Sequence, residues 1–111
     1  MNELKTLAEV CSITKVSRRA IQGYEEKGLV VAKEKNKYGH LLYDDEMIRR
    51  IERIKLYQQL GFKVREIQEI IDEPNDVLKS ELMKKMILLE KDIKVKQCVI
   101  LQVQKIIEEL S

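Results

Sequence analysis

Residues 17–28 read SRRAIQGYEEKG, and the rest of the chain is arranged around them. They predict one short helix, because Ser17 is a good N-cap whose hydroxyl accepts a hydrogen bond from a free backbone N–H. Arg18 and Arg19 fall in the first turn, and Gly28 follows the end of the helix as a residue that tolerates a left-handed turn. A helix start that carries two arginines is a natural phosphate contact.

A second short helix is predicted immediately before this one. Thr6-Leu-Ala-Glu9 has the form of a capping box, in which each side chain satisfies a backbone N–H near the other, so a helix should begin near Leu7. Polar and β-branched residues at 12–16 then separate the two helices. The pair is a candidate helix-turn-helix, although two short capped helices also occur in many bundles.

The segment after Gly28 predicts a β-hairpin. Residues 29–31 and 40–43 are two short extended stretches, and the polar turn between them contains Asn36 and Gly39. Three lysines alternate near the tip, and an extended backbone would place them on one side: Lys33, Lys35 and Lys37. A basic hairpin that follows a helix-turn-helix is the wing of a winged helix, and a solubilising loop is the alternative.

Charge is unevenly distributed along the chain. Residues 15–37 carry seven basic and three acidic side chains, a local charge of +4, whereas residues 73–111 carry seven of each. A basic segment beside a neutral one is typical of a local contact with nucleic acid. Chance clustering on a solvated surface would give the same pattern, so charge alone does not decide the function.

Composition argues against several other classes of protein. A single histidine, no glycine-rich phosphate loop and no paired carboxylates with an obvious cleft disfavour an enzyme, and we expect no cofactor. Cys11 and Cys98 are too far apart in sequence for a chelating motif, so we expect no metal. No apolar run approaches the roughly 18 residues that span a membrane, and the N-terminus does not resemble a signal peptide. We therefore expect a cytoplasmic protein with no membrane contact.

Two further helices are predicted between residues 44 and 71. Asp44 is the expected cap of the first helix, and Gly61 is expected to end it. The second helix covers residues 64–71, and Pro74 prevents its continuation. The apolar stripe of the first helix consists of Met47, Ile48, Ile51, Ile54 and Tyr57.

From residue 75 to residue 110 no proline or glycine interrupts the chain, so we expect one helix ~52 Å long. Positions along it alternate spacings of four and three, which is the heptad pattern of a coiled coil. The apolar members are Leu82, Met86, Leu89, Ile93, Ile100, Val103, Ile107 and Leu110, and Lys96 alone breaks the series. A second copy of the chain is the simplest partner, and the alternative is a helix that folds back along the chain's own helices.

Together these motifs resemble the MerR family of transcription regulators. Residues 6–11 resemble the first helix of the family, and residues 16–29 align without gaps with its recognition helix. Residues 39–43 match the end of its wing. The most specific match is residues 50–71, with Leu-Gly-Phe at their centre, which resemble its second helix pair.

The resemblance implies a mainly α-helical fold, with a winged helix-turn-helix DNA-binding domain over residues 1–73 and a dimerisation helix over residues 75–111. It also implies a homodimer whose antiparallel coiled coil holds two heads apart. Such a dimer binds a palindromic site in double-stranded DNA, distorts the promoter spacer and acts on RNA polymerase indirectly. We expect a minimal form of the family without a sensor domain. The candidate DNA contacts are Lys15, Ser17, Arg18, Arg19, Gln22, Tyr24, Lys33, Lys35, Lys37, His40 and Tyr43.

Five positions depart from the family pattern. The family usually has an arginine where this chain has Gln22, and an aromatic residue where it has Gly23. Its wing commonly carries a proline at the position of Ala32, and Gly-Tyr-Arg where this chain has Gly39-His40-Leu41. Two expected DNA contacts are therefore missing, and either the wing lysines compensate or the operator differs.

Two other functions remain open. A DNA-architectural protein, such as an excisionase-like factor, shares a winged head but normally lacks a long coil. A protein-interaction module would use the coil and not the head. Salt-sensitive binding to DNA separates this last function from the two DNA-binding ones.

Overall fold

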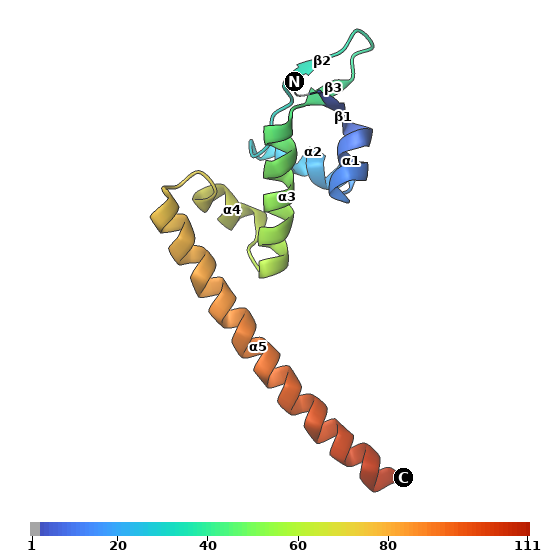
Figure 1. Cartoon of the computed structure of the whole chain (residues 1–111), viewed down its shortest axis with the longest axis vertical. Coiled ribbons are helices and arrows are strands. Elements are labelled where there is room, and N and C mark those ends of the chain that lie inside the picture. The colour runs from blue at the N-terminus through green and yellow to red at the C-terminus, as the bar shows by residue number, and fades with distance from the viewer. Residues whose placement is uncertain (1–2) are drawn as a thin grey trace. The chain divides into compact units, whose positions relative to one another are not determined.

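The computed structural model describes residues 3–111, which form five helices and three short strands (Figure 1). In chain order the elements are β1 (Lys5–Thr6), α1 (Leu7–Thr14), α2 (Arg18–Glu26), β2 (Glu34–Lys35), β3 (Leu41–Tyr43), α3 (Asp45–Leu60), α4 (Val64–Ile70) and α5 (Asn75–Leu110). This order confirms the predicted fold class, a mainly α-helical winged helix-turn-helix followed by a long helix.

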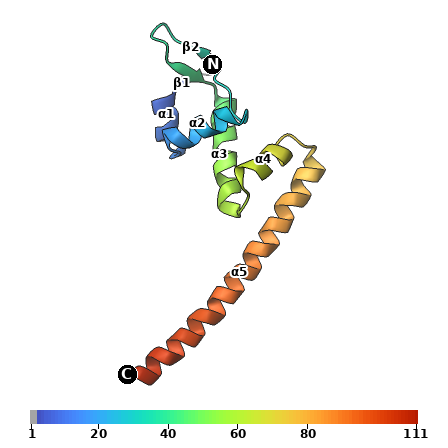
Figure 2. The ribbon, with the colours of Figure 1, turned by 180° about the vertical axis from the view of Figure 1, so that it is seen from behind.

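The chain divides into two compact units, and the division lies between Asp72 and Glu73. The first unit, called the head below, contains β1 to α4, and the second contains α5. Within the head, α1 and α2 lie beside α3, and the three strands gather at the end of α3 where that helix begins (Figures 1 and 2).

Both helices of the helix-turn-helix are capped as the sequence predicts. The backbone N–H of Ala20 donates to the hydroxyl of Ser17 over 3.1 Å, so α2 begins at the expected residue. Thr6 and Glu9 form the capping box of α1. Gly28 has a φ of +74°, which is the left-handed conformation that favours glycine after a helix.

The sheet differs from the prediction at its first and second strands. Its order is β1-β3-β2, with both pairs antiparallel, and β1 was not predicted from the sequence. The expected strand at residues 29–31 is wrong, because the hairpin begins later, at β2. Leu29 and Val30 are instead buried in the core of the head. Two apolar residues can be buried without forming a strand. The β-branched sequence at residues 29–31 therefore led to a wrong prediction of a strand.

The remaining helices of the head follow the predicted pattern. The side chain of Asp44 caps α3 by accepting from the N–H of Met47, and Gly61 ends the helix with a φ of +115°. The inward face of α3 is buried, and α4 ends at Ile70, one residue before the predicted end. The buried residues of α3 are Ile48, Ile51, Ile54 and Tyr57.

The last element, α5, is one uninterrupted helix with the predicted bounds. Its seam is open to solvent in the single chain. Leu82 is half-buried, and the other seven apolar members of the seam are between 42% and 81% exposed. Such a row of exposed apolar side chains is what a coiled-coil helix presents before it meets a partner.

Candidate nucleic-acid interface

Local hydrogen bonds fix the turn between α1 and α2. Lys15 adopts a left-handed φ of 60°, and its N–H donates to the carbonyl of Cys11 over 2.9 Å, which ends α1. Val16 is buried, and its N–H donates to the hydroxyl of Thr14 over 3.2 Å. From α3, the ammonium of Lys55 donates to the carbonyl of Thr14 over 3.2 Å. The start of α2 is therefore held in a defined position on the head.

The helix that follows buries one face and exposes the other. Ile21 and Tyr24 are buried in the core of the head. The exposed side carries four of the candidate contacts, namely Ser17, Arg18, Arg19 and Gln22. Two guanidinium groups and one amide thus reach solvent from the first half of α2, which is the half that enters the major groove in helix-turn-helix proteins.

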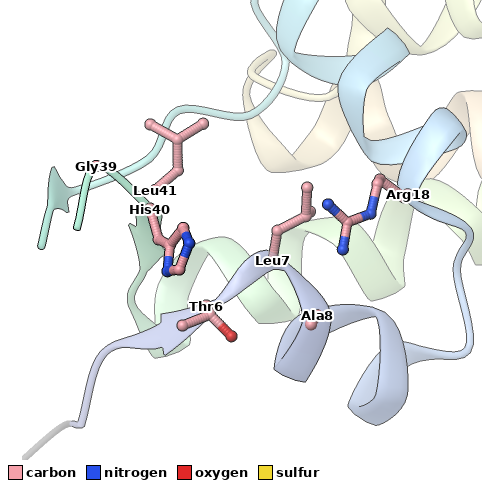
Figure 3. Close-up of a pocket in the computed structure, with 7 residues that line it drawn as sticks. All are labelled: Thr6, Leu7, Ala8, Arg18, Gly39, His40 and Leu41. Carbon is pink, nitrogen blue, oxygen red and sulfur yellow. The ribbon is translucent and has the colours of Figure 1, made fainter.

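Arg18 and His40 line the same surface hollow, which has a volume of about 510 Å³ (Figure 3). Arg18 reaches it from α2 and His40 from the wing, and the start of α1 forms the remaining wall. In the view of Figure 3, Leu7 lies between the guanidinium and the imidazole. The pairing of Lys5 with Tyr43 ties the wing to the start of α1, so α2 and the wing border one surface.

Several cations of this surface are not neutralised within the chain. Over residues 3–111, the side chains of Lys15, Arg18, Arg19 and Lys35 form no ion pair or hydrogen bond. Exposed, unpaired cations on α2, on the turn before it and on the wing are suited to contact with a phosphate backbone.

The wing lysines are less regular than the sequence predicts. Of the three lysines, only Lys35 lies in strand β2. The alternation of side chains along a strand therefore does not place all three on one side. Lys33 lies 4.0 Å from the carboxylate of Asp44, and the ammonium of Lys37 lies 5.1 Å from the ring centre of Tyr38. Tyr38 itself is 72% exposed at the hairpin tip. Tyr38 was not among the predicted contacts, although an aromatic residue between a lysine and a turn glycine is a usable signal.

Two of the predicted DNA contacts are corrected by the structure. Tyr24 is 4% exposed, and its hydroxyl donates to the amide oxygen of Gln58 over 2.6 Å. Tyr43 is fully buried, and its hydroxyl donates to the carboxylate of Glu25. Burial raises the pKa of both hydroxyls, and the carboxylate of Glu25 raises that of Tyr43 further. Both rings belong to the core, so neither offers a side chain to a groove.

Arg50 holds the segment that follows α2 in place, a role that the sequence did not predict. Its Nε donates to the carbonyl of Leu29, which follows α2, and its two terminal nitrogens donate to the carboxylate of Asp72 over 2.8 and 2.9 Å. The guanidinium lowers the pKa of Asp72. Gln68 of α4 adds a second tie by donating to the carbonyl of Lys27 over 2.8 Å. The end of α2 is thereby fastened to α3 and α4.

Other kinds of site find no support in the described part of the chain. Residues 3–111 contain no group of three potential metal ligands, and Cys11 and Cys98 are both free thiols. None of the helices in this range is long and apolar enough to span a membrane.

Comparison with known proteins places the head in one family. Residues 5–74 match the family of MerR HTH regulatory proteins. The nodulation protein NolA of Bradyrhizobium sp. (strain NC92) is 36% identical over 66 residues, which are 60% of this chain and 28% of that protein. The chain spans between 27% and 30% of the length of the first curated relatives that it matches.

Solved structures extend the similarity beyond the head. The N-terminal part of the Bacillus subtilis multidrug transporter activator, MtaN, has a TM-score of 0.71 and 26% identity, and the match covers 91% of this chain and 95% of that one. HiNmlR, described as a MerR family regulator lacking the sensor domain and bound to promoter DNA, has a TM-score of 0.58 and 16% identity over 96% and 80% of the two chains. At 16% identity, the similarity to HiNmlR concerns the fold alone.

Proposed function

The chain belongs to the MerR family of helix-turn-helix regulatory proteins, and on this basis we propose that it works as a homodimer that binds a palindromic promoter site and distorts the spacer DNA. Proteins of this family are transcription regulators and not enzymes. The proposed dimer acts in the cytoplasm, where it changes the path of the DNA and reaches RNA polymerase only through that change. Sequence-dependent deformation of the spacer would add to its specificity.

One observation carries the proposal. The start of α2 and the wing border the same hollow through Arg18 and His40, and the side chains of Arg18 and Arg19 are unpaired over residues 3–111. A duplex laid on this surface would receive α2 in its major groove and the wing on the flanking backbone. Lys15, Lys33, Lys35 and Lys37 would then contact phosphates, while Ser17 and Gln22 face the groove.

Gln22 is the residue most suited to reading a base in this arrangement. Its amide is exposed on the same side of α2 as the two arginines. A glutamine donates to N7 and accepts from N6 of adenine in a bidentate contact, whereas an arginine prefers the two acceptors of guanine. We therefore propose that Gln22 shifts the base preference of this protein relative to family members with arginine at that position.

The exposed seam of α5 supports the dimer. Its eight apolar side chains follow the heptad spacing, and all of them except the half-buried Leu82 are exposed in the single chain. Two copies joined through this seam would present two heads to two half-sites, and a palindromic site is the DNA symmetry that matches a twofold protein.

The test uses a fluorescein-labelled duplex that the protein itself selects from a random library. We compare the intact duplex with one in which half of the inverted repeat is scrambled. Two chains should bind the intact duplex, and the scrambled one should bind more than about 100-fold more weakly, because each mismatched base pair costs about 1–3 kcal/mol. Donor and acceptor dyes at the duplex ends report the bend.

Other outcomes identify the competing functions. Equal affinity for both duplexes, with one chain bound to each, contradicts the palindromic dimer. Equal bending of every sequence indicates an architectural protein. No salt-sensitive binding to any duplex indicates a protein-interaction module that works through α5.

A further inference from the structure

Tyr38, at the tip of the wing, is an aromatic residue that the head does not use for its core. Its side chain is 72% exposed, whereas the other three tyrosines and the phenylalanine of the chain are buried. Over residues 3–111 its hydroxyl has no hydrogen-bond partner. The ring therefore contributes little to the stability of the head, and it is available to a partner.

The tip that carries this ring has a fixed backbone. The side-chain oxygen of Asn36 accepts from the N–H of Tyr38 over 2.9 Å and from the N–H of His40 over 3.0 Å. The backbone N–H of Asn36 donates to the carbonyl of His40, and its carbonyl accepts from Gly39, which has a φ of +81°. Asn36 thus holds the turn in one conformation, so a partner of Tyr38 would lose little free energy in ordering the loop.

The tip continues the surface that α2 and the wing border. The ring centre of Tyr38 lies 6.4 Å from that of His40, which lines the hollow together with Arg18 (Figure 3). Lys35 is the cross-strand partner of Leu41, which lines the same hollow. Cross-strand partners lie on one face of a sheet, so Lys35 is on the face of the wing that borders the hollow.

We propose that Tyr38 contacts the DNA backbone and that Asn36 is its positioning residue. The ring packs on a deoxyribose at the edge of the minor groove, and the hydroxyl donates to the adjacent phosphate. With α2 in the major groove, a hairpin beside it reaches the backbone that borders the next minor groove. This inference rests on the DNA binding of the proposed function, and it adds a contact residue and the residue that positions it.

The charges around the ring favour a sugar-phosphate backbone as its partner. The ammonium of Lys37 lies 5.1 Å from the ring centre of Tyr38, and Lys35 lies three residues before the tyrosine. Glu34 is the single carboxylate among residues 33–43. An aromatic face suits the apolar side of a deoxyribose, and ammonium groups beside it suit the phosphates on either side.

This contact also compensates for a departure from the family pattern. The wing of the family usually has tyrosine and arginine at the positions of His40 and Leu41. Tyr38 and Lys37 restore a phenol and a cation to the wing, but nearer its tip. The proposed contact therefore belongs to this chain and not to the usual wing.

Hydroxyl-radical footprinting on the selected duplex tests the contact, because the radical attacks deoxyriboses from the minor groove. The wild type should protect a group of deoxyriboses in each half-site. Tyr38→Ala should lose part of this protection and should weaken binding by roughly 10- to 100-fold in fluorescence anisotropy, since each head loses a hydrogen bond to a charged phosphate. Tyr38→Phe, which keeps the ring, should keep the protection and lose only part of the affinity.

Asn36→Ala tests the positioning role. It should lose protection at the same deoxyriboses as Tyr38→Ala, while the rest of the footprint and the temperature of unfolding stay those of the wild type. Leu56→Ala, which removes an exposed leucine of α3, is the control and should change neither footprint nor affinity.

Three results would overturn this inference alone. They are a wild-type footprint and affinity for Tyr38→Ala, a wild-type footprint for Asn36→Ala, and a Tyr38→Phe variant that loses the same protection as Tyr38→Ala. If the wild type binds no duplex, the proposed function fails and this inference fails with it.

Discussion

Arg19 lies in the first exposed turn of α2, where its guanidinium can reach a base edge or a phosphate. If it reads a base, Arg19→Ala should weaken binding to the selected duplex by about 1–3 kcal/mol and relax the preference at one base pair. If it contacts a phosphate, the loss should be smaller and nearly the same on every sequence. Fluorescence anisotropy with the selected and a scrambled duplex separates the two. Lys91→Ala, which removes an exposed lysine of α5, should bind like the wild type.

Replacing Tyr24 and Tyr38 by alanine compares the loss of a buried tyrosine with the loss of an exposed one. Tyr24→Ala should lower the free energy of unfolding by about 3–5 kcal/mol, because it empties a buried site and leaves Gln58 without its partner. Tyr38→Ala should change stability by no more than about 0.5 kcal/mol, since the ring is exposed. Urea denaturation measures both. A small loss for Tyr24→Ala would contradict its place in the core.

Single residues were predicted well where the chemistry is local. The caps Thr6, Ser17 and Asp44 could be identified because a cap depends on neighbours in sequence. The two buried tyrosines could not, since their hydroxyls meet partners that lie 34 and 18 residues away. Arg50 was missed for the same reason, because its ties to Leu29 and Asp72 exist only in the folded head.

At the scale of elements, helices were predicted more accurately than strands. An α-helix satisfies its own backbone, so period and caps defined α2 to α5 within a residue or two. The end of α1 was predicted too early, because the helix continues to Thr14, through three of the residues expected to separate it from α2. The three strands are two or three residues long and exist only through pairing with one another. Their positions depend on tertiary contacts, which is why β1 was missed and the first strand of the hairpin was placed too early.

The bond between Arg50 and Asp72 makes the support of α2 sensitive to pH. The guanidinium lowers the pKa of Asp72 in the folded state, so the stabilisation is complete above the ordinary value of 3.8 and is lost as the pH falls through the lower folded-state pKa. Asp72→Asn should therefore unfold more easily than the wild type at neutral pH, and the difference should shrink below that value. The effect should be small, because Asp72 is largely exposed.

Thermal unfolding of both proteins across this pH range measures the effect. Glu69→Gln, which removes an exposed carboxylate of α4, is the control and should show no such convergence with the wild type. A difference between Asp72→Asn and the wild type that stays constant down to the lowest pH would contradict the assigned bond.

At the scale of the whole molecule, the proposed dimer depends on the seam of α5. Leu89→Lys places a charge in an apolar layer of the seam, so it should abolish the dimer in analytical ultracentrifugation. Leu101→Lys, at an exposed leucine outside the seam, should leave the dimer intact. If Leu89→Lys still sediments as a dimer, the seam is not the interface.

In the proposed dimer, unpaired cations at the start of α2 and on the wing of each copy bind DNA phosphates. The most direct test is the salt dependence of binding to the selected duplex, because each phosphate contact contributes about 0.9 to the slope of log affinity against log salt. The wild type should show a steep linear decrease. Lys35→Ala should reduce the slope by about 2, one contact from each head. A wild-type affinity that does not change with salt, or a slope that Lys35→Ala and Arg18→Ala both leave unchanged, would contradict the account.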